Sequence, residues 1–228
     1  MDEEPAAVDE RLCDLLRFAG LSTLQVKQTK QFSSYLSLIL RWNARLNLTA
    51  VRDTESILSR HFVESIACAR ALPTGIRTLL DFGSGAGFPG IPIAICRPEI
   101  AITLAESHGK KAAFLQEAVR TLSLSAKVHT GRAEVLISKF DCVTLRAVDK
   151  MDQAVNAATR LVAQTGWLSL MTTAADASRF QSIVGTEFRW QDSIALAGSE
   201  QRILVLGQRI VPTADEFNAR STAEGPPV

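Results

Sequence analysis

The sequence predicts an α/β fold in which a doubly wound, mostly parallel sheet follows a cap of helices. From residue 77 onward, short apolar runs of strand length alternate with helical segments, which is the pattern of a doubly wound sheet. Before that point, residues 11–72 carry apolar side chains spaced three and four apart, as at Leu36, Ile39 and Leu40. We therefore expect an N-terminal helical cap over residues 1–74 and a sheet domain over residues 75–211.

The sheet domain is expected to contain seven strands. Strands are predicted at residues 78–82, 101–106, 126–130, 140–147, 166–173, 194–196 and 203–210. Helices are predicted from about residue 90, over residues 110–122 and 151–163, and near residues 175–184. The last two strands leave no room for a helix between them, so they are predicted to form an antiparallel hairpin around a turn at residues 197–201.

The chain ends and the composition indicate which segments are disordered and in which cellular compartment the protein is expected. Residues 1–10 and the polar, proline-rich tail 212–228 are predicted to be disordered. The acidic start MDEEPAAVDE is unlike a secretory signal, and no apolar run approaches the length of a membrane span, so a cytoplasmic protein with no membrane partner is expected. The four cysteines lack C-x-x-C spacing, so they are interpreted as reduced and structural, and no metal site is expected.

The segment TLLDFGSGAGFPGIPIAI, residues 78–95, predicts a cofactor loop between a buried strand and a helix. Glycines at positions 83, 85 and 87 permit positive φ and close approach of a ligand to the backbone. Pro89 and Pro92 suit a first helical turn, so the free amides at that helix start are expected to face a polar ligand. A glycine-rich turn of this kind can also be only a tight connection.

The glycine spacing points to an adenine nucleoside. Counted from Gly85, the G-x-G-x-x-G fingerprint is met by Gly87 and Gly90, and Glu106 follows about twenty residues later, where an acid binds ribose hydroxyls. The spacing leaves open whether the nucleoside carries nicotinamide or methionine.

Longer runs of sequence resemble a known family. The closing hairpin is typical of the Rossmann-like class I S-adenosylmethionine methyltransferases more than of nicotinamide dehydrogenases. The runs RWNARLNLTAVRDTESILSRHFVES, LLDFGSGAGFPGIPIAI, TLAESHGKKAAFLQEAV, GRAE and FDCVTLRAV resemble the RsmG (GidB) family of bacterial 16S rRNA guanine-N7 methyltransferases, closely over residues 40–148. The resemblance implies S-adenosyl-L-methionine as cofactor and N7 of guanine 527 in 16S rRNA as methyl acceptor. Loss of this family is associated with low-level streptomycin resistance.

The resemblance also implies roles for individual residues. Gly83 and Phe88 would line the methionine end of the cofactor, Gly85 and Gly87 would shape the loop, and Glu106 would take the ribose hydroxyls, where the family usually has Asp. The adenine would meet Ala133 and Glu134, although Glu is also favoured at any helix N-terminus. Arg146 would contact cofactor or substrate as a positioning residue, although an arginine at a strand end is often only an ion-pair partner. No general base is expected, because guanine N7 carries a lone pair and no proton.

Charge distribution suggests where RNA would bind. Residues 27–52 contain five basic residues and no acid, interleaved with Tyr35 and Trp42, so cations could contact phosphates and an aromatic could stack on a base. A solvated helix face with Trp42 in the core would give the same pattern. The family signature favours RNA-binding roles for Asn43, Asn47, Thr49, Arg52 and His61, some of which would only pin the cap to the sheet. Lys110 and Lys111 could also reach phosphate, although lysines in a first helical turn are commonly only solvated.

Two other function classes stay open at this point. A Rossmann NAD-dependent oxidoreductase would be stabilised by a nicotinamide cofactor and not by S-adenosylhomocysteine. A non-catalytic RNA- or ribosome-binding module would bind 30S subunits without transferring a methyl group. For the methyltransferase, the expected partner is 16S rRNA or the 30S subunit, and the chain is expected to act as a monomer.

Overall fold

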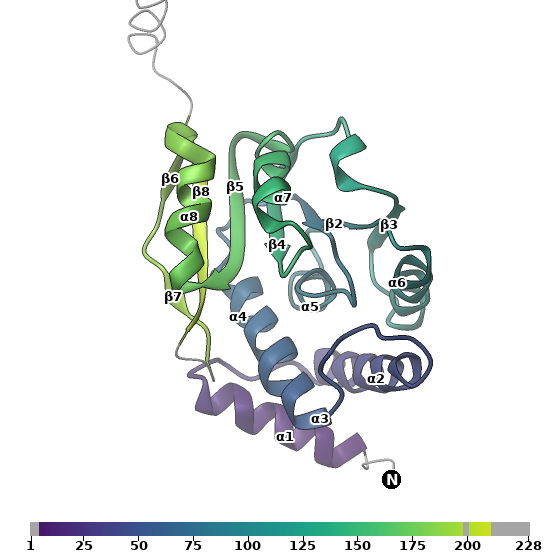
Figure 1. Ribbon diagram of the computed structural model, residues 1–228. Coiled ribbons are helices and arrows are strands. Elements are labelled where there is room, and N and C mark those ends of the chain that lie inside the picture. The colour runs from purple at the N-terminus through teal and green to yellow at the C-terminus, as the bar shows by residue number, and fades with distance from the viewer. Residues whose placement is uncertain (1–4, 198–200, 211–228) are drawn as a thin grey trace, which may run out of the picture.

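A single mixed sheet organises the computed structural model, which describes residues 5–197 and 201–210 (Figure 1). Its strands lie in the order β3-β2-β1-β4-β5-β8-β6, and β7 pairs with β8 off this path. The strands are β1 (Thr78–Phe82), β2 (Ala101–Glu106), β3 (Ala126–Thr130), β4 (Phe140–Arg146), β5 (Val162–Thr173), β6 (Phe188–Trp190), β7 (Ile194–Ala195) and β8 (Arg202–Arg209).

The first five strands are parallel, and β8 runs antiparallel to β5, β6 and β7. The chain moves outward from β1 through β2 to β3 and then returns to β4 on the other side of β1. This reversal places a topological switch point between β1 and β4, where ligands of open α/β sheets bind beyond the carboxyl ends of the strands. The predicted α/β class with a closing antiparallel hairpin is therefore confirmed.

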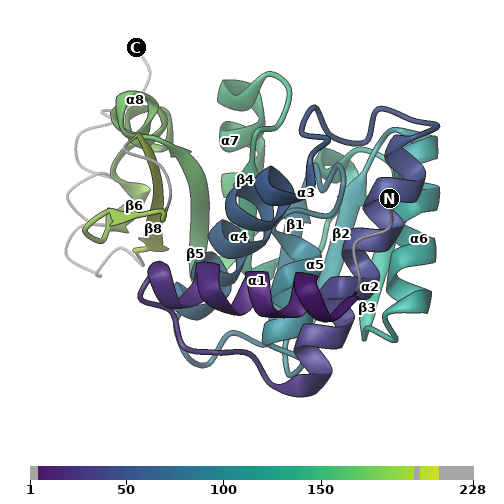
Figure 2. The same ribbon diagram turned by 90° about the horizontal axis from the view of Figure 1, so that it is seen from below.

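Helices cover both faces of the sheet. The helical segments are α1 (Pro5–Phe18), α2 (Val26–Asn43), α3 (Thr54–Ser56), η1 (Ile57–Val63), α4 (Glu64–Ala71), α5 (Gly90–Cys96), α6 (Gly109–Thr121), η2 (Ala133–Val135), α7 (Met151–Thr159), α8 (Ala174–Val184) and η3 (Gly185–Glu187). Figure 2 shows α7 and α8 on one side of the sheet and the N-terminal helices with α5 on the other.

Strand alternation explains the two cores, because successive side chains of a strand point to opposite faces. Leu79 of β1 and Cys142 of β4 belong to the core under the N-terminal helices. Their chain neighbours Leu80 and Val143 belong to the core under α7 and α8. Arg146, four residues after Cys142, therefore leaves β4 on the side of the N-terminal helices.

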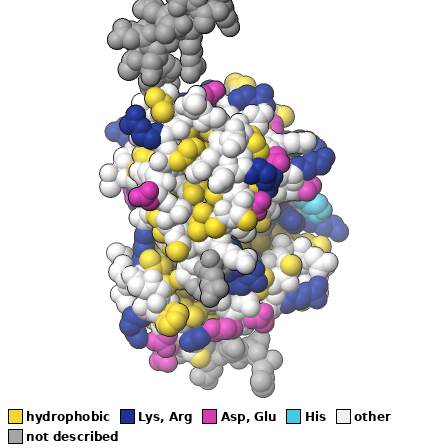
Figure 3. All heavy atoms as spheres, turned by 60° about the vertical axis from the view of Figure 1, so that its left-hand side comes forward, with side chains coloured by type: hydrophobic (Ala, Val, Ile, Leu, Met, Phe, Trp, Pro, Cys, Tyr) yellow, Lys and Arg dark blue, Asp and Glu magenta, His cyan; other side chains and the backbone are white. Residues whose placement is uncertain are grey.

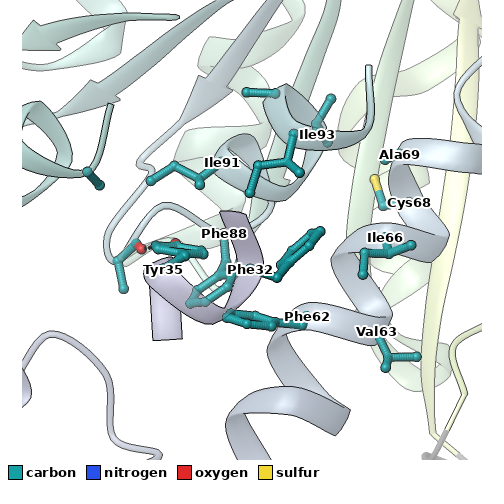
Figure 4. Packing of buried hydrophobic residues seen from close by; sticks show 14 of the residues in the cluster. Phe32, Tyr35, Phe62, Val63, Ile66, Cys68, Ala69, Phe88, Ile91 and Ile93 are labelled. Carbon is teal, nitrogen blue, oxygen red and sulfur yellow. Dashed lines mark hydrogen bonds between the residues drawn. The ribbon is translucent and has the colours of Figure 1, made fainter. Parts of the chain in front are cut away.

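Aromatic side chains join the helical cap to the sheet. Tyr35 of α2 stacks on Phe62 of η1, with ring centroids 5.4 Å apart, and lies at the same centroid distance from Phe88 (Figure 4). The Tyr35 hydroxyl donates a 2.5 Å hydrogen bond to the carbonyl of Ala86, inside the glycine-rich loop. Burial raises the pKa of this phenol well above its ordinary value, so it remains a donor. The cap thus fixes the loop directly.

Several boundaries differ from the sequence expectations. Residues 5–10 belong to α1, so the expected disorder of residues 1–10 is wrong there, while residues 1–4 and the tail 212–228 lie outside the described residues. The predicted turn at residues 197–201 also lies partly outside them. An eighth strand, β6, was not expected, because three residues are too few to show alternation. Helix α7 ends at Thr159 rather than residue 163, because β5 already begins at Val162.

Candidate functional site

A cavity of about 220 Å³ opens at the carboxyl ends of β1 and β2. Five segments line it: the end of β1 with Gly83, the end of β2, the segment 131–134, the loop 148–150 after β4, and residues 153–154 of α7. This arrangement brings together Gly83, Ala133 and Glu134, three residues predicted to hold the cofactor from separate parts of the sequence. Their meeting follows from parallel pairing, which places the carboxyl ends of neighbouring strands at one edge.

Glu106 ends β2 beside this cavity, and its carboxylate is held by backbone amides. One oxygen accepts a 2.9 Å hydrogen bond from Gly85 N–H, and the other accepts a 2.7 Å bond from His108 N–H. Each carboxylate oxygen has two lone pairs, so both can still accept from a ligand. The bond from Gly85 thus fixes the predicted glycine loop and the predicted ribose acid relative to each other.

The glycine loop requires glycine for conformation and for space. Gly83, Gly85 and Gly87 all have positive φ, at +73°, +57° and +91°. A Cβ at position 83 would lie 3.1 Å from Val148, and both residues line the cavity. A Cβ at position 87 would lie only 2.7 Å from the Tyr35 hydroxyl oxygen. Gly83 therefore leaves room on the ligand side, whereas Gly87 leaves room on the side of the cap.

The expectation that free amides at the start of α5 face a ligand is wrong. Gly90 N–H donates a 3.2 Å hydrogen bond to the carboxylate of Asp81, and Ile91 N–H donates to the carbonyl of Gly87. Asp81 is fully buried, and its second oxygen has no hydrogen-bond partner in the described structure. Burial raises the pKa of Asp81 to about 7. Asp81, the acid in the first predicted strand, therefore accepts the hydrogen bond of an amide at the start of α5.

Arg146 lies at the end of β4 in a buried network with the cap. Its guanidinium donates to the Glu64 carboxylate at 2.9 Å, to the Ser65 hydroxyl at 3.1 Å and to the Arg60 carbonyl at 2.7 Å. Glu64 is fully buried and also accepts a 2.6 Å bond from Arg202 of β8. Burial lowers the pKa of Arg146, and the Glu64 charge opposes this shift. Arg146 therefore forms an ion pair with Glu64, which is the alternative role considered for an arginine at a strand end.

His61 completes this network in a defined tautomer. Its Nδ1 lies 3.1 Å from an Arg146 nitrogen, which can only donate, so Nδ1 accepts. Burial and the nearby arginine charges lower the pKa of His61 to about 3, so the ring is neutral and Nε2 carries the proton toward the Thr49 hydroxyl at 3.0 Å. The ring also stacks on Phe88, with centroids 4.6 Å apart. His61 lies in η1, a π-helical turn of the kind that occurs frequently at functional sites.

Phe88 and Arg146 meet next to the glycine loop. The Arg146 guanidinium lies 6.0 Å from the centroid of the Phe88 ring, and Phe88 is buried among His61, Tyr35 and Phe62. In this arrangement Phe88 belongs to the packing beneath the loop. Its predicted contact with the methionine end of the cofactor stays a prediction.

The predicted RNA residues of the cap divide into inward and outward groups. Asn43 accepts hydrogen bonds from Leu48 N–H and Thr49 N–H and donates to the carbonyl of Val51, so it shapes the loop 44–53. Thr49 and His61 bond to each other, as described. Asn47 and Arg52 are exposed and bond to each other at 2.8 Å. On α6, Lys110 is exposed and Lys111 is half-buried.

Sequence reasoning missed Glu64, Ser65 and the segment 148–150 as parts of the site. The cavity segment follows the predicted fourth strand directly, so its place at the strand end could have indicated it. Glu64 carried no such signal, because its partners Arg146 and Arg202 are 82 and 138 residues away in sequence.

The cavity fits the nucleoside part of S-adenosylmethionine. Glu106, whose chain neighbours Ala105 and Ser107 line the cavity, has free lone pairs that suit ribose hydroxyls. Glu134 and the backbone at Ala133 line the cavity itself and would offer a carboxylate and an amide to an adenine edge. Within the described ranges there is no cluster of three or more His, Cys, Asp or Glu that could hold a metal ion. No helix among the described residues is long and apolar enough to cross a membrane.

Solved structures share this fold. A SAM-dependent methyltransferase from Aquifex aeolicus aligns with a TM-score of 0.55 at 13% identity, covering 68% of this chain and 93% of that one. The P. horikoshii TYW2 protein in complex with MeSAdo aligns with a TM-score of 0.54 at 12% identity, covering 65% and 62%. These likenesses support the class I methyltransferase fold.

Relatives found by sequence similarity identify the family as well as the fold. Ribosomal RNA small subunit methyltransferase G of Roseiflexus castenholzii is 37% identical over 216 residues, covering 88% of this chain and 92% of the relative. The protein of the same name from Roseiflexus sp. strain RS-1 is 42% identical over 149 residues, covering 62% and 63%. The family model GidB, rRNA small subunit methyltransferase G, matches residues 28–184, which include most of α2, the cavity and Arg146. The chain therefore belongs to the GidB family, a family of methyltransferases whose cofactor is S-adenosyl-L-methionine.

Proposed function

We propose that this protein transfers a methyl group from S-adenosyl-L-methionine to N7 of guanine 527 in 16S rRNA. The observation that carries the proposal is the family match over residues 28–184, because it includes the cap loop, the cofactor cavity and the end of β4 in one continuous stretch. The names of the relatives, which describe methylation of small-subunit ribosomal RNA, support the same substrate class. A nicotinamide-dependent oxidoreductase is no longer a candidate, because the family is one of methyltransferases.

The chemistry of guanine N7 agrees with the protonation states around Arg146. When bound, the cofactor supplies an electrophilic methyl group on a sulfonium. N7 offers a lone pair in the plane of the ring and loses no proton, so the protein has to align the reactants rather than remove a proton. His61 uses both ring nitrogens within the protein, and Asp81 is fully buried. Both groups are therefore occupied or enclosed within the protein, and the proposed acceptor N7 requires no general base.

Arg146 is proposed to position the cofactor or the guanine. Its guanidinium is fixed from three sides by Glu64, Ser65 and the Arg60 carbonyl, and it lies close to Phe88 at the glycine loop. A cation with little freedom to move can stabilise a transition state with no reorganisation at the moment of reaction. Replacing Arg146 with Ala is expected to lower methyl transfer while the fold survives, and unchanged turnover would remove Arg146 from the site.

The proposed RNA-binding roles differ between the side chains that reach the surface and those that bond within the protein. Asn47, Arg52, Lys110 and Lys111 are proposed to contact RNA, since their side chains reach the surface wholly or in part. Asn43, Thr49 and His61 are proposed to act through the shape of the loop 44–53, since their polar atoms bond within the protein.

The decisive test is transfer of labelled methyl from S-adenosylmethionine to 16S rRNA and to 30S subunits from a strain that lacks the modification. Mass spectrometry then maps the methylated base. Label on N7 of guanine 527 is the expected result, and the comparison of free rRNA with 30S subunits identifies the preferred form of the substrate. Sedimentation of the active protein tests the prediction that it acts as a monomer.

Two outcomes would overturn the proposal. Label at another base would keep the methyltransferase and change its target. Binding of 30S subunits without any transfer, while calorimetry confirms that cofactor binds, would favour a non-catalytic ribosome-binding module. A Glu106→Gln variant is the matched control, because it should lower the affinity for cofactor and leave the affinity for RNA unchanged.

A further inference from the structure

A second cavity lies outside the cofactor site, between the end of α2 and the start of α6. It measures about 640 Å³ and is lined by Arg41, Trp42, Arg45, Leu46, Lys110 and Glu117. Its lining shares no residue with the cofactor cavity. Small-molecule sites in proteins range from about 300 to 1,000 Å³, so this cavity has the size of a ligand site.

Trp42 is fixed in this cavity by its neighbours. Its indole N–H donates a 3.1 Å hydrogen bond to the Glu117 carboxylate, and its ring packs edge-on against Phe114 with centroids 5.6 Å apart. Glu117 also forms an ion pair with Arg41. A rigid aromatic ring at an accessible site can bind another ring at a low cost in conformational entropy.

The charge of the cavity is positive. Glu117 is matched by Arg41, whereas the side chains of Arg45 and Lys110 make no hydrogen bond or ion pair with any described residue. Two cations beside a fixed indole suit a ligand that combines an aromatic ring with an anion. A nucleotide has both parts, since its base can stack on the ring and its phosphate can meet the cations.

The surroundings favour a strand of nucleotides over a single anion. A third cavity, of about 580 Å³, lies at the other end of the α2–α6 contact and is lined in part by Lys27 and Lys30. The sequence from Lys27 to Arg52 contains no acid. The face shown in Figure 3 differs, since acidic and basic side chains are interspersed around exposed hydrophobic ones there. The Trp42 cavity is lined by three cations and one carboxylate, and such an excess of positive charge attracts a polyanion.

The position of the Trp42 cavity relates it to the chemistry. Lys110 lies in the first turn of α6, four residues after Glu106, so the cavity opens near the edge of the sheet where the cofactor cavity lies. Figure 2 shows α2 lying alongside α6. An RNA strand that delivers its guanine to the cofactor would therefore pass within reach of this cavity.

We propose that the Trp42 cavity binds a nucleotide of the substrate RNA other than the methylated guanine, with the base against Trp42 and the phosphate between Arg45 and Lys110. The proposal relies on the proposed function only in taking the substrate RNA as the source of the strand. Binding here would fix the RNA at a second point and so contribute to affinity rather than to the chemical step.

The first experiment uses a fluorescently labelled hexamer of cytidine ribonucleotides, which contains no guanine and so cannot present a methyl acceptor. Its affinity is measured by anisotropy in the presence of saturating S-adenosylhomocysteine, for the wild type, Arg45→Gln, Lys110→Gln and Trp42→Leu. Arg189→Gln is the matched control, because Arg189 is an exposed arginine on β6. Thermal melting of each variant checks that the fold is intact.

Each substitution in the cavity should weaken binding by about fivefold or more, because base stacking and phosphate contacts are each of that size. Arg45→Gln should also reduce the slope of log affinity against log salt by about 0.7, the value for one phosphate contact to a single strand. Arg189→Gln should change neither quantity. With 16S rRNA as substrate, Arg45→Gln should raise KM for RNA and leave kcat and cofactor affinity unchanged.

Three results would overturn the inference. The first is that Arg45→Gln and Trp42→Leu bind the cytidine hexamer with the same affinity and the same salt dependence as the wild type. The second is binding of an acidic peptide such as hexaglutamate in preference to the cytidine hexamer, which would indicate a protein partner. The third is a change in cofactor affinity rather than in KM for RNA. If rRNA methylation itself fails, the hexamer measurements still decide whether the cavity binds nucleotides.

Discussion

Replacing Glu64 with Gln tests the buried charge network most directly. The substitution keeps the shape of the side chain and removes the negative charge that Arg146 and Arg202 share. The carboxylate is fully buried, with bonds of 2.9 and 2.6 Å to the two guanidinium groups, and the Arg146 side chain is only 12% exposed. Its loss leaves the Arg146 charge in a poorly solvated place without a counter-ion.

The magnitude follows from that burial. Removing one partner of a buried ion pair costs about 3–5 kcal/mol, because the remaining charge is neither solvated nor paired. In a chain of this size 1 kcal/mol corresponds to about 2–4 °C, so the melting temperature of Glu64→Gln should fall by about 6–20 °C. Urea denaturation should show the same loss in the free energy of unfolding.

An exposed ion pair provides the control. Glu55 pairs with Arg11, and both side chains are about half exposed, at 53% and 49%. Glu55→Gln should therefore cost about 1 kcal/mol or less, and salt should reduce the effect further. If Glu64→Gln costs no more than Glu55→Gln, or if salt reduces both effects alike, the reasoning about a desolvated network is refuted.

Four further predictions follow from the site. Asp81→Asn should stabilise the protein above pH 7 and have little effect near pH 4. The folded-state pKa of Asp81 is raised to about 7, so ionisation of Asp81 costs folding free energy as the pH rises from the unfolded-state pKa to the folded-state pKa. The cost reaches about 4 kcal/mol for three pKa units, and asparagine avoids it. Urea titrations at both pH values check this, and parallel pH profiles for the two proteins would contradict it. Glu106→Gln should raise the Kd for S-adenosylmethionine about tenfold in calorimetry, as expected for losing a charged hydrogen-bond acceptor, and an unchanged Kd would remove Glu106 from the ribose site. Gly87→Ala should destabilise the fold by about 2 kcal/mol or more, because its φ is +91° and the new Cβ would lie 2.7 Å from the Tyr35 hydroxyl oxygen; a melting temperature equal to the wild type would show that the loop shifts freely. Asn43→Ala should speed hydrogen exchange of the Leu48 and Thr49 amides and raise KM for RNA, with cofactor affinity as the unchanged reference; exchange at wild-type rates would show that the side chain does not hold the loop.

Local sequence patterns and the family resemblance together indicated residues that the fold brings to one edge of the sheet, while their roles toward the cofactor stay predictions. A buried strand, spaced glycines and an acid at the end of the next strand are all short-range features, and parallel pairing then brings Gly83, Ala133 and Glu134 into one cavity. The alternation of strands and helices likewise predicted the class of fold, because each element shows its own period.

The cap side of the site was less predictable, because its polar contacts join residues far apart in the chain. Nothing in the run RHFVES indicates that Glu64 would be enclosed by arginines from two strands, or that His61 would use both ring nitrogens inside the protein. The same holds for the start of α5, where the buried acid Asp81 takes the amide that a ligand was expected to meet. Such outcomes depend on burial, which a motif does not encode.

The shared core under the N-terminal helices limits how the chain can be divided. Leu12 of α1 and Phe32 of α2 belong to the same buried cluster as Leu79 of β1 and Leu204 of β8. A fragment that begins at residue 75 would expose the apolar face of its own sheet to water, at a cost of about 25 cal/mol for each Å². Although the division into residues 1–74 and 75–211 remains a prediction, a protease that cuts between α4 and β1 should yield two insoluble pieces rather than an independent catalytic module.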